Sequence, residues 1–331
     1  MQRRNFLASS LVLPTAVASA AHSTSLASRA LAPSYSVGGR AQMRHGGKFR
    51  VSLKADAIGV DGTADELLNA AIKHGYQALS VPAQWLEGWS MADKKKYHQK
   101  AIDNDISWGA NGLPVEFRKS EEQFRQDLAA LPMHAQNLAD IGVTRIGTWL
   151  ISGSDTMTYN ENMKFHADRL GECAAILGKH DIKLGLEYLG TASIRHNARF
   201  AWLSTGRELK ELISLIGLPN VGVILDSFHW YTAQEKAEDL MIWKNEEIVA
   251  VDLNDANAQL ALVDQTDVAR ELPGATGVID LDAFLKALAK IGYDGPLRAE
   301  PFSSTLNGMA NELALAATYN AVYGAVVKAL E

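Results

Sequence analysis

Short apolar runs alternate with longer amphipathic segments along the chain from Phe49 onward. Apolar runs of about four to eight residues that are rich in β-branched side chains are typical of strands buried on both faces. The predicted strands are Phe49–Leu53, Tyr76–Val81, Ile106–Ala110, Thr144–Leu150, Lys183–Tyr188, Val221–Leu225, Ile248–Leu253 and Pro296–Ala299. Each of them is followed by a longer segment with a different period.

These longer segments carry an apolar residue every three or four positions, which predicts helices. The predicted helices are Ala64–His74, Met91–Asn104, Glu121–Ile141 with a kink at Pro132, Glu161–His180, Thr205–Ile216, Ala233–Lys244, Asp280–Ile291 and Asn311–Leu330. Glycine follows several of them, as at Gly75 and Gly292, where it is the usual helix stop signal. Because strand and helix alternate eight times without a linker, we predict an α/β fold, a single (β/α)8 TIM barrel.

The first twenty residues have the three parts of an export signal: a basic start, an apolar stretch and a small-residue cleavage pattern. Arg3 and Arg4 resemble the twin-arginine export motif, with ordinary secretion as the alternative. We therefore predict a signal peptide over 1–20, a flexible linker over 21–48 and the barrel over 49–331. The protein is expected in the periplasm, with no membrane contact after the signal is cleaved.

Composition narrows the class of ligand. The 331 residues include 32 Lys and Arg against 38 Asp and Glu, for a formal net charge of −6. A chain of this charge lacks the basic surface of a nucleic-acid binder, so a small-molecule substrate is expected and nucleic acid is not. Cys173 is the one cysteine and forms no internal disulfide. Assembly into a homo-oligomer stays open.

Four acids directly follow apolar strands, at Glu187, Asp226, Asp252 and Glu300. Taken alone, each of these acids could be the N-cap of the next helix. Together they occupy the ends of the last four predicted strands, where barrel enzymes carry their chemistry. Carboxylates held this close repel one another unless a cation compensates, and hard oxygen ligands suit Mg²⁺, Mn²⁺ or Ca²⁺. The pattern predicts a shared site for a divalent metal ion.

Five segments resemble the xylose-isomerase-like sugar isomerase/epimerase family. They are Gly185-Leu186-Glu187-Tyr188, Leu225-Asp226-Ser227-Phe228-His229, Val251-Asp252-Leu253-Asn254-Asp255, Arg270-Glu271-Leu272-Pro273-Gly274 with Gly277-Val278-Ile279-Asp280, and Ala299-Glu300-Pro301-Phe302. The resemblance implies that Glu187, Asp226 and Glu300 hold a divalent metal ion. It also implies that the two glutamates move protons.

Asp252 departs from the family pattern, which has histidine at the corresponding strand end. A carboxylate in place of a neutral imidazole adds one negative charge and favours Mn²⁺, with Mg²⁺ or Ca²⁺ as alternatives, over Zn²⁺. Three interpretations of Asp252 stay open: a direct ligand, a ligand through water, or a sign of altered chemistry.

Supporting residues follow the strand ends. His229, three residues after Asp226, is expected to face the substrate and hydrogen-bond one of its oxygens, as the resemblance implies. Arg270 is a candidate anchor for substrate oxygens, against a surface ion pair. Trp149 and Trp230 are candidates for apolar walls on which a sugar ring packs, against simple core packing. Lys54, at the end of the first strand, is expected to be solvated.

The predicted function is a metal-dependent sugar isomerase or epimerase that forms an enediolate from a non-phosphorylated keto- or aldo-sugar. A lyase or dehydratase acting on a keto-sugar or keto-glycoside is the alternative, because the same enediolate expels a β leaving group. A non-catalytic sugar-binding barrel is a minor alternative. Metal-dependent DNA-repair nucleases share this barrel fold, but they need further histidines at positions where this chain has Ser80, Gly109 and Asp252. A nuclease is therefore not expected.

Overall fold

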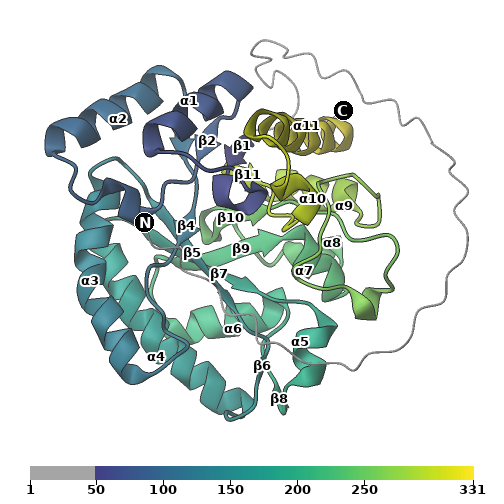
Figure 1. Ribbon diagram of the computed structural model, residues 1–331. Helices are drawn as coiled ribbons and strands as arrows, with labels where there is room; N and C mark the ends of the chain where they lie inside the picture. Colours follow the sequence, from purple (N-terminus) through teal and green to yellow (C-terminus); the bar gives the residue numbers. More distant parts are fainter. Residues whose placement is uncertain (1–48) are drawn as a thin grey trace, which may run out of the picture. The chain divides into compact units, whose positions relative to one another are not determined.

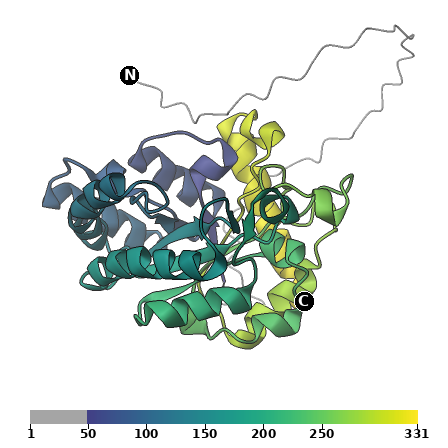
Figure 2. The same cartoon turned by 90° about the horizontal axis from the view of Figure 1, so that it is seen from below.

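The computed structural model describes residues 49–331. The predicted signal peptide over 1–20 and the predicted linker over 21–48 lie outside these residues. In the described part, parallel strands form the centre and helices surround them (Figure 1). The same arrangement is visible from below in Figure 2. The fold is the predicted TIM barrel.

All strand pairs in the main sheet are parallel, in the order β3-β2-β1-β11-β10-β9-β7-β5-β4. Its strands are β1 (Arg50–Leu53), β2 (Ala78–Leu79), β3 (Ser107–Trp108), β4 (Asn111–Gly112), β5 (Arg145–Leu150), β7 (Lys183–Tyr188), β9 (Val221–Asp226), β10 (Ile248–Asp252) and β11 (Pro296–Arg298). A separate antiparallel pair joins β6 (Gly153–Ser154) and β8 (Phe200–Ala201). Eight main-sheet strands lie at the eight predicted runs, and β4 directly follows the run Ile106–Ala110 that contains β3.

The two ends of the sheet, β3 and β4, are separated only by Gly109 and Ala110. They act as one interrupted strand, which closes the barrel. Gly109 lies where the interior is tight, because a Cβ atom there would be 2.7 Å from the Ser52 hydroxyl and 2.8 Å from the Ser80 hydroxyl. A side chain at this position would therefore disturb the barrel where it closes.

Most helices begin and end within two residues of the prediction. The helices are α1 (Ala64–His74), α2 (Met91–Asp103), α3 (Glu121–Ala139), α4 (Tyr159–Gly178), α5 (Ala192–Asn197), α6 (Gly206–Ile216), α7 (Ser227–Thr232), α8 (Ala237–Leu240), α9 (Leu281–Ile291), α10 (Ser304–Asn307) and α11 (Asn311–Leu330), with 3₁₀ turns at η1 (Ala55–Ile58), η2 (Ala83–Leu86), η3 (Asn245–Glu247) and η4 (Leu262–Asp264). Gly75 and Gly292 end their helices with φ of 83°, as glycine permits. Pro132 lies inside α3, and its kink stays a prediction.

One predicted helix was wrong. The segment Ala233–Lys244 contains only the single-turn helix α8, whereas the unpredicted α7 begins directly after β9. Asp226 caps α7 by accepting a hydrogen bond from the Phe228 N–H at 2.7 Å. Gln234, with φ of 60°, then takes the chain out of the helical conformation. The strand-end acid therefore starts a helix earlier than the apolar period indicates.

Helix α11 is the one described helix that is long and apolar enough to cross a membrane. It packs against α9, α1 and β1, and the Tyr76 hydroxyl donates a hydrogen bond of 2.9 Å to the Leu315 carbonyl. These contacts place it as the last helix of the barrel wall.

A buried histidine in the core makes the stability of the fold depend on pH. Helix α4 places His166 against Trp202, with ring centroids 4.2 Å apart, and its Nδ1 lies 3.0 Å from the Asn162 carbonyl oxygen. Burial disfavours the charged ring and lowers the pKa of His166 to about 4.

We predict that acidification weakens the fold through His166. Between pH 6.5 and 4 the unfolded chain binds a proton that the folded chain excludes, so the free energy of unfolding decreases as pH falls. Between pH 7 and 5 the loss from this residue is about 2 kcal/mol. Urea unfolding at both pH values should show that His166→Gln removes this part of the pH dependence. His196→Gln, at an exposed site, is the control; an equal pH dependence in all three proteins would contradict the prediction.

Candidate active site

Four carboxylates converge at the C-terminal ends of neighbouring strands, as predicted. Glu187 lies near the end of β7, Asp226 and Asp252 end β9 and β10, and Glu300 follows β11. One oxygen from each lies within 4.8 Å of one from every other, and all four residues are buried. In parallel pairing Asp226 and Asp252 are direct partners across β9 and β10. The strand register therefore brings the acids together.

Two cations stand beside two of these acids. The Arg298 guanidinium contacts both oxygens of Asp252: Nε donates to Oδ1, and Nη2 donates to Oδ2 at 2.9 Å. The Lys54 ammonium lies 3.0 Å from Glu300 Oε1, and its side chain is 17% exposed. The expectation that Lys54 is solvated was therefore wrong, because the carboxylate at the next strand end holds it inside the mouth of the barrel.

A third cation, Arg270, lies on the other side of the cluster. Its Nη1 donates to Asp226 Oδ2 at 2.7 Å, and its Nη2 donates to Asp267 Oδ1 at 2.5 Å. The same guanidinium is 3.9 Å from Glu300 Oε2. Arg270 is 2% exposed, so it is part of the site and not of a surface ion pair.

The two glutamates lie in opposite electrostatic settings. Burial, reinforced by the neighbouring carboxylates of Glu300 and Asp226, raises the pKa of Glu187 well above its usual range. Burial acts on Glu300 in the same direction, but Lys54 and the two arginines outweigh it and lower the pKa of Glu300. Burial also raises the pKa of Asp252 to about 6, against the opposing effect of Arg298. One glutamate thus favours its neutral form and the other its charged form.

His229 is held in one tautomer. The Gly190 N–H donates to Nδ1 at 3.2 Å, so the proton of the neutral ring lies on Nε2. Asp267 Oδ1, 3.2 Å from Nε2, can accept this proton; Arg270 Nη2 lies 3.1 Å from the same nitrogen but is itself a donor, and its hydrogen bond goes to Asp267. Gly190 is required for this approach, because a Cβ there would lie 2.2 Å from the His229 carbonyl oxygen.

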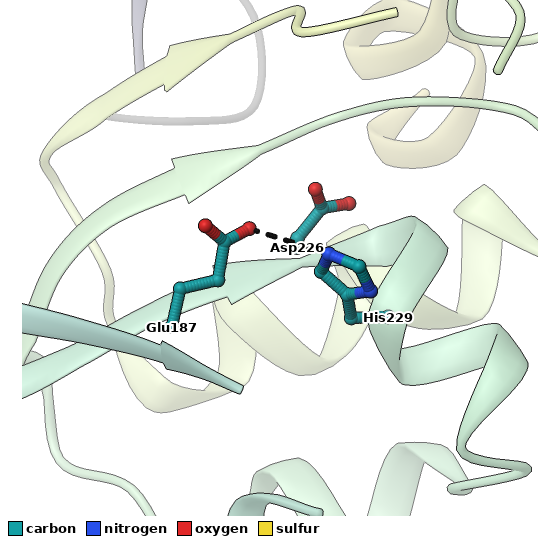
Figure 3. Close-up of side chains that lie close together, drawn as sticks. All are labelled: Glu187, Asp226 and His229. Carbon is teal, nitrogen blue, oxygen red and sulfur yellow. Dashed lines mark ion pairs between the residues drawn. The ribbon is translucent and has the colours of Figure 1, made fainter. Parts of the chain in front are cut away.

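This tautomer distinguishes between two groups of residues that could hold a metal ion. Figure 3 shows His229 facing Glu187, with Nε2 and Oε1 3.7 Å apart, beside Asp226. A group of His229 with the two acids would need a lone pair on Nε2, which carries the proton. The four-carboxylate group, from Glu187 to Glu300, remains for a metal ion, and His229 presents a donor.

Three donor groups in total fix the Asp226 carboxylate. The Asn254 amide donates to both of its oxygens at 3.1 Å, in addition to Arg270 and the Phe228 N–H. Asn254 also accepts a hydrogen bond of 2.9 Å from the Glu300 N–H. This side chain therefore ties the end of β9 to the residue that follows β11. Asp226 is both a helix cap and a member of the site.

The donor set fits a divalent cation. Five carboxylates meet the side chains of Lys54, Arg270 and Arg298 here, which leaves a formal excess of two negative charges among these groups. Oε1 of Glu187 is buried without a hydrogen-bond partner among the described residues, although an unpartnered buried oxygen is costly. A hard divalent ion satisfies both requirements, since its ligands are carboxylate oxygens.

The family model described as Xylose isomerase-like TIM barrel matches residues 68–320. This chain belongs to that family. An inosose isomerase of Bacillus velezensis is 24% identical over 235 residues, which cover 70% of this chain and 80% of the relative. A ketose 3-epimerase of Arthrobacter globiformis is 35% identical over 104 residues, which cover 31% and 32% of the two chains. A crystal structure of the IOLI protein with a bound zinc atom superposes with a TM-score of 0.71 at 22% identity, covering 85% of this chain and 99% of the other.

The two tryptophans of the sequence prediction differ in place. Trp149 is 44% exposed and is the strand partner of Glu187, and the Arg118 guanidinium lies 4.0 Å from its ring centroid. Trp149 therefore stands open at the mouth of this xylose isomerase-like barrel. Trp230 is buried against Phe284, with ring centroids 5.4 Å apart, so its predicted role as a substrate wall was wrong. Helix α7 turns it toward α9.

Four residues that contact the acids or Arg270 were not predicted to belong to the site: Lys54, Asn254, Asp267 and Arg298. A signal was present for Arg298, because a charged residue inside a short apolar strand needs a partner. Lys54 ends the first strand, where its partner belongs to the last strand of the barrel. Asn254 and Asp267 both lie in the long segment after β10. No local sequence pattern indicated which residues they contact, because these partners include residues of other elements.

We predict that Arg270→Met destabilises the fold by about 3–5 kcal/mol, because it leaves the buried carboxylate of Asp226 without its cation. Lys164→Met is the control, since both side chains of the Lys164–Asp168 ion pair are exposed and the pair contributes about 1 kcal/mol or less. Urea unfolding of both variants measures the difference. Equal, small losses would show that Asp226 does not depend on Arg270.

Proposed function

We propose that this protein is a metal-dependent sugar isomerase or epimerase that acts on a non-phosphorylated keto- or aldo-sugar. The observation that carries the proposal is one buried carboxylate cluster in which Lys54 pairs with Glu300, whereas Oε1 of Glu187 has no hydrogen-bond partner among the described residues. Two groups with separated pKa values supply an acid and a base to the same substrate. The names of the two relatives, an inosose isomerase and a ketose 3-epimerase, support the same class of reaction.

The carboxylates of Glu187, Asp226 and Glu300 would hold the metal ion, and Mn²⁺ suits this oxygen-rich set, with Mg²⁺ or Ca²⁺ as alternatives. A bound divalent ion polarises a carbonyl group and so acidifies the C–H bond beside it. Asp252 stands apart from these three because Arg298 engages both of its oxygens.

Glu300 is the base of this proposal. Its carboxylate is held ionised by Lys54 and is ready to take the proton from the carbon beside the carbonyl. Glu187, whose pKa burial and the neighbouring carboxylates raise when no metal ion is bound, would return a proton to the enediolate that results. Return to the same carbon from the other face inverts that centre and gives an epimer, whereas return to the neighbouring carbon gives an aldose-ketose isomer.

Substrate oxygens would be bound by His229 and Arg270. The Nε2–H of His229 points into the cluster and the Arg270 guanidinium adjoins it, so both can donate to a carbonyl or hydroxyl oxygen. Both contact Asp267, whose side chain is 29% exposed. A substrate oxygen can replace the Asp267 carboxylate as their acceptor. Trp149 offers an open apolar face for the sugar ring.

A non-phosphorylated substrate is part of the proposal for two reasons. Export to the periplasm, proposed from the sequence of residues 1–20, would separate the enzyme from cytoplasmic sugar phosphates. The chain also lacks a glycine-rich phosphate loop of the Walker type.

We predict that Glu187→Gln reduces the exchange of solvent protons into the substrate by about 10²–10⁴-fold, because the amide cannot carry the proton. The measurement incubates manganese-loaded protein with a panel of free and 3-keto sugars in D₂O and follows deuterium beside the carbonyl by NMR. Glu172→Gln, on the outer face of α4, should exchange like the unaltered protein. Sugar binding without exchange in the unaltered protein would support a non-catalytic barrel, and a new double bond would select the lyase.

Metal removal is a separate test. After dialysis against a chelator, we predict loss of deuterium exchange and its return with Mn²⁺, since the excess negative charge of the cluster lacks a counter-ion without it. Thermal unfolding should shift to lower temperature in the chelated protein and recover with the metal. Unchanged exchange and unchanged unfolding after complete metal removal would contradict the metal-dependent reaction.

A further inference from the structure

Arg298 is a buried charge inside the last strand of the barrel. Strand register makes it the direct partner of Asp252 on β10 and of Ser52 on β1. Its Nη1 donates to the Ala110 carbonyl at 2.6 Å, across the barrel interior. The guanidinium is therefore built into the floor of the site and held at three of its nitrogens.

Asp252 is the carboxylate partner of Arg298. Two parallel hydrogen bonds engage both oxygens of Asp252, the strongest geometry for an arginine and a carboxylate. Among the described residues, Asp252 is the one carboxylate that Arg298 binds. Arg270 differs, since it is divided among Asp226, Asp267 and the more distant Glu300.

The pair divides the charge of the cluster into two parts. Asp252 and Arg298 together are neutral, as a neutral histidine would be at the same strand end. Among the described residues, the remaining acids, Glu187, Asp226, Glu300 and Asp267, form ion pairs with Lys54 and Arg270 as their Lys or Arg partners, so the formal excess of two negative charges belongs to this part. The unpartnered oxygen, Oε1 of Glu187, is in this second part as well.

We propose that Asp252 and Arg298 form one neutral unit that does not ligate the metal ion, and that Arg298 thereby lowers the affinity of the site for divalent cations. This inference rests on the metal centre of the proposed function. It assigns the metal ion to three carboxylates and makes Arg298 a positioning residue. One fewer protein ligand leaves one more position for a water molecule or a substrate oxygen.

Isothermal titration of the purified full chain with Mn²⁺, checked by the EPR signal of free Mn²⁺, tests the unit. Arg298→Met should tighten Mn²⁺ binding at least tenfold, because Asp252 then adds an uncompensated negative charge beside the site. Arg298→Lys, which keeps the charge, should bind within threefold of the unaltered protein. The double variant Asp252→Asn/Arg298→Met should also bind within threefold, since it removes both charges at once.

Arg169→Met is the matched control, because Arg169 is also buried and pairs with Glu121 and with the Phe117 carbonyl on the outer wall of the barrel. It should leave Mn²⁺ affinity unchanged. The Lys and double variants keep the test available where Arg298→Met does not fold.

The outcomes separate the two proposals. A double variant that binds Mn²⁺ more than tenfold more weakly would overturn the neutral unit and make Asp252 a ligand. Equal affinities in the unaltered protein and Arg298→Met would overturn the role of Arg298 alone. Absence of binding in every variant would overturn the metal centre and this inference together. Binding by Arg298→Met only would support the role of Arg298 and contradict the metal-dependent function of the unaltered chain.

Discussion

Repulsion among buried carboxylates is the constraint on which the rest of this site depends. Two unit charges about 5 Å apart repel by about 3 kcal/mol at an effective dielectric of about 20. Four such groups meet within 4.8 Å at the mouth of the barrel. Three cations from different parts of the chain offset this repulsion: the buried Arg270 and Arg298 and the half-buried Lys54. What they leave uncompensated is the charge available for a metal ion and for proton transfer.

The barrel imposes this arrangement through strand register. Asp252 is paired with Asp226 on one side and with Arg298 on the other, so an acid and its cation arrive together from consecutive strands. Asn254 then joins the carboxylate of Asp226 to the backbone at Glu300. Because these contacts are made by strands and not by loops alone, the site is as rigid as the sheet that carries it.

The sequence predicted the barrel because its strands are continuous apolar runs and its helices have a clear period, which are local signals. It predicted the four acids because each follows an apolar run, at or near the end of a strand. It could not predict their neutralisation, since the partners of Lys54 and Arg298 lie far away in the chain, at Glu300 and across the barrel at Ala110. The sequence also did not predict the burial of Trp230. This burial depends on distant residues, through the capping of α7 by Asp226 and the contact with Phe284 of α9.

A crystal structure of the protein grown with Mn²⁺ and recorded at the manganese absorption edge tests the central claim most directly. The account predicts one strong anomalous peak at coordination distance, about 2.0–2.3 Å, from oxygens of Glu187, Asp226 and Glu300. A cluster without an anomalous peak, with Lys54 and the two arginines still neutralising the acids, would contradict it.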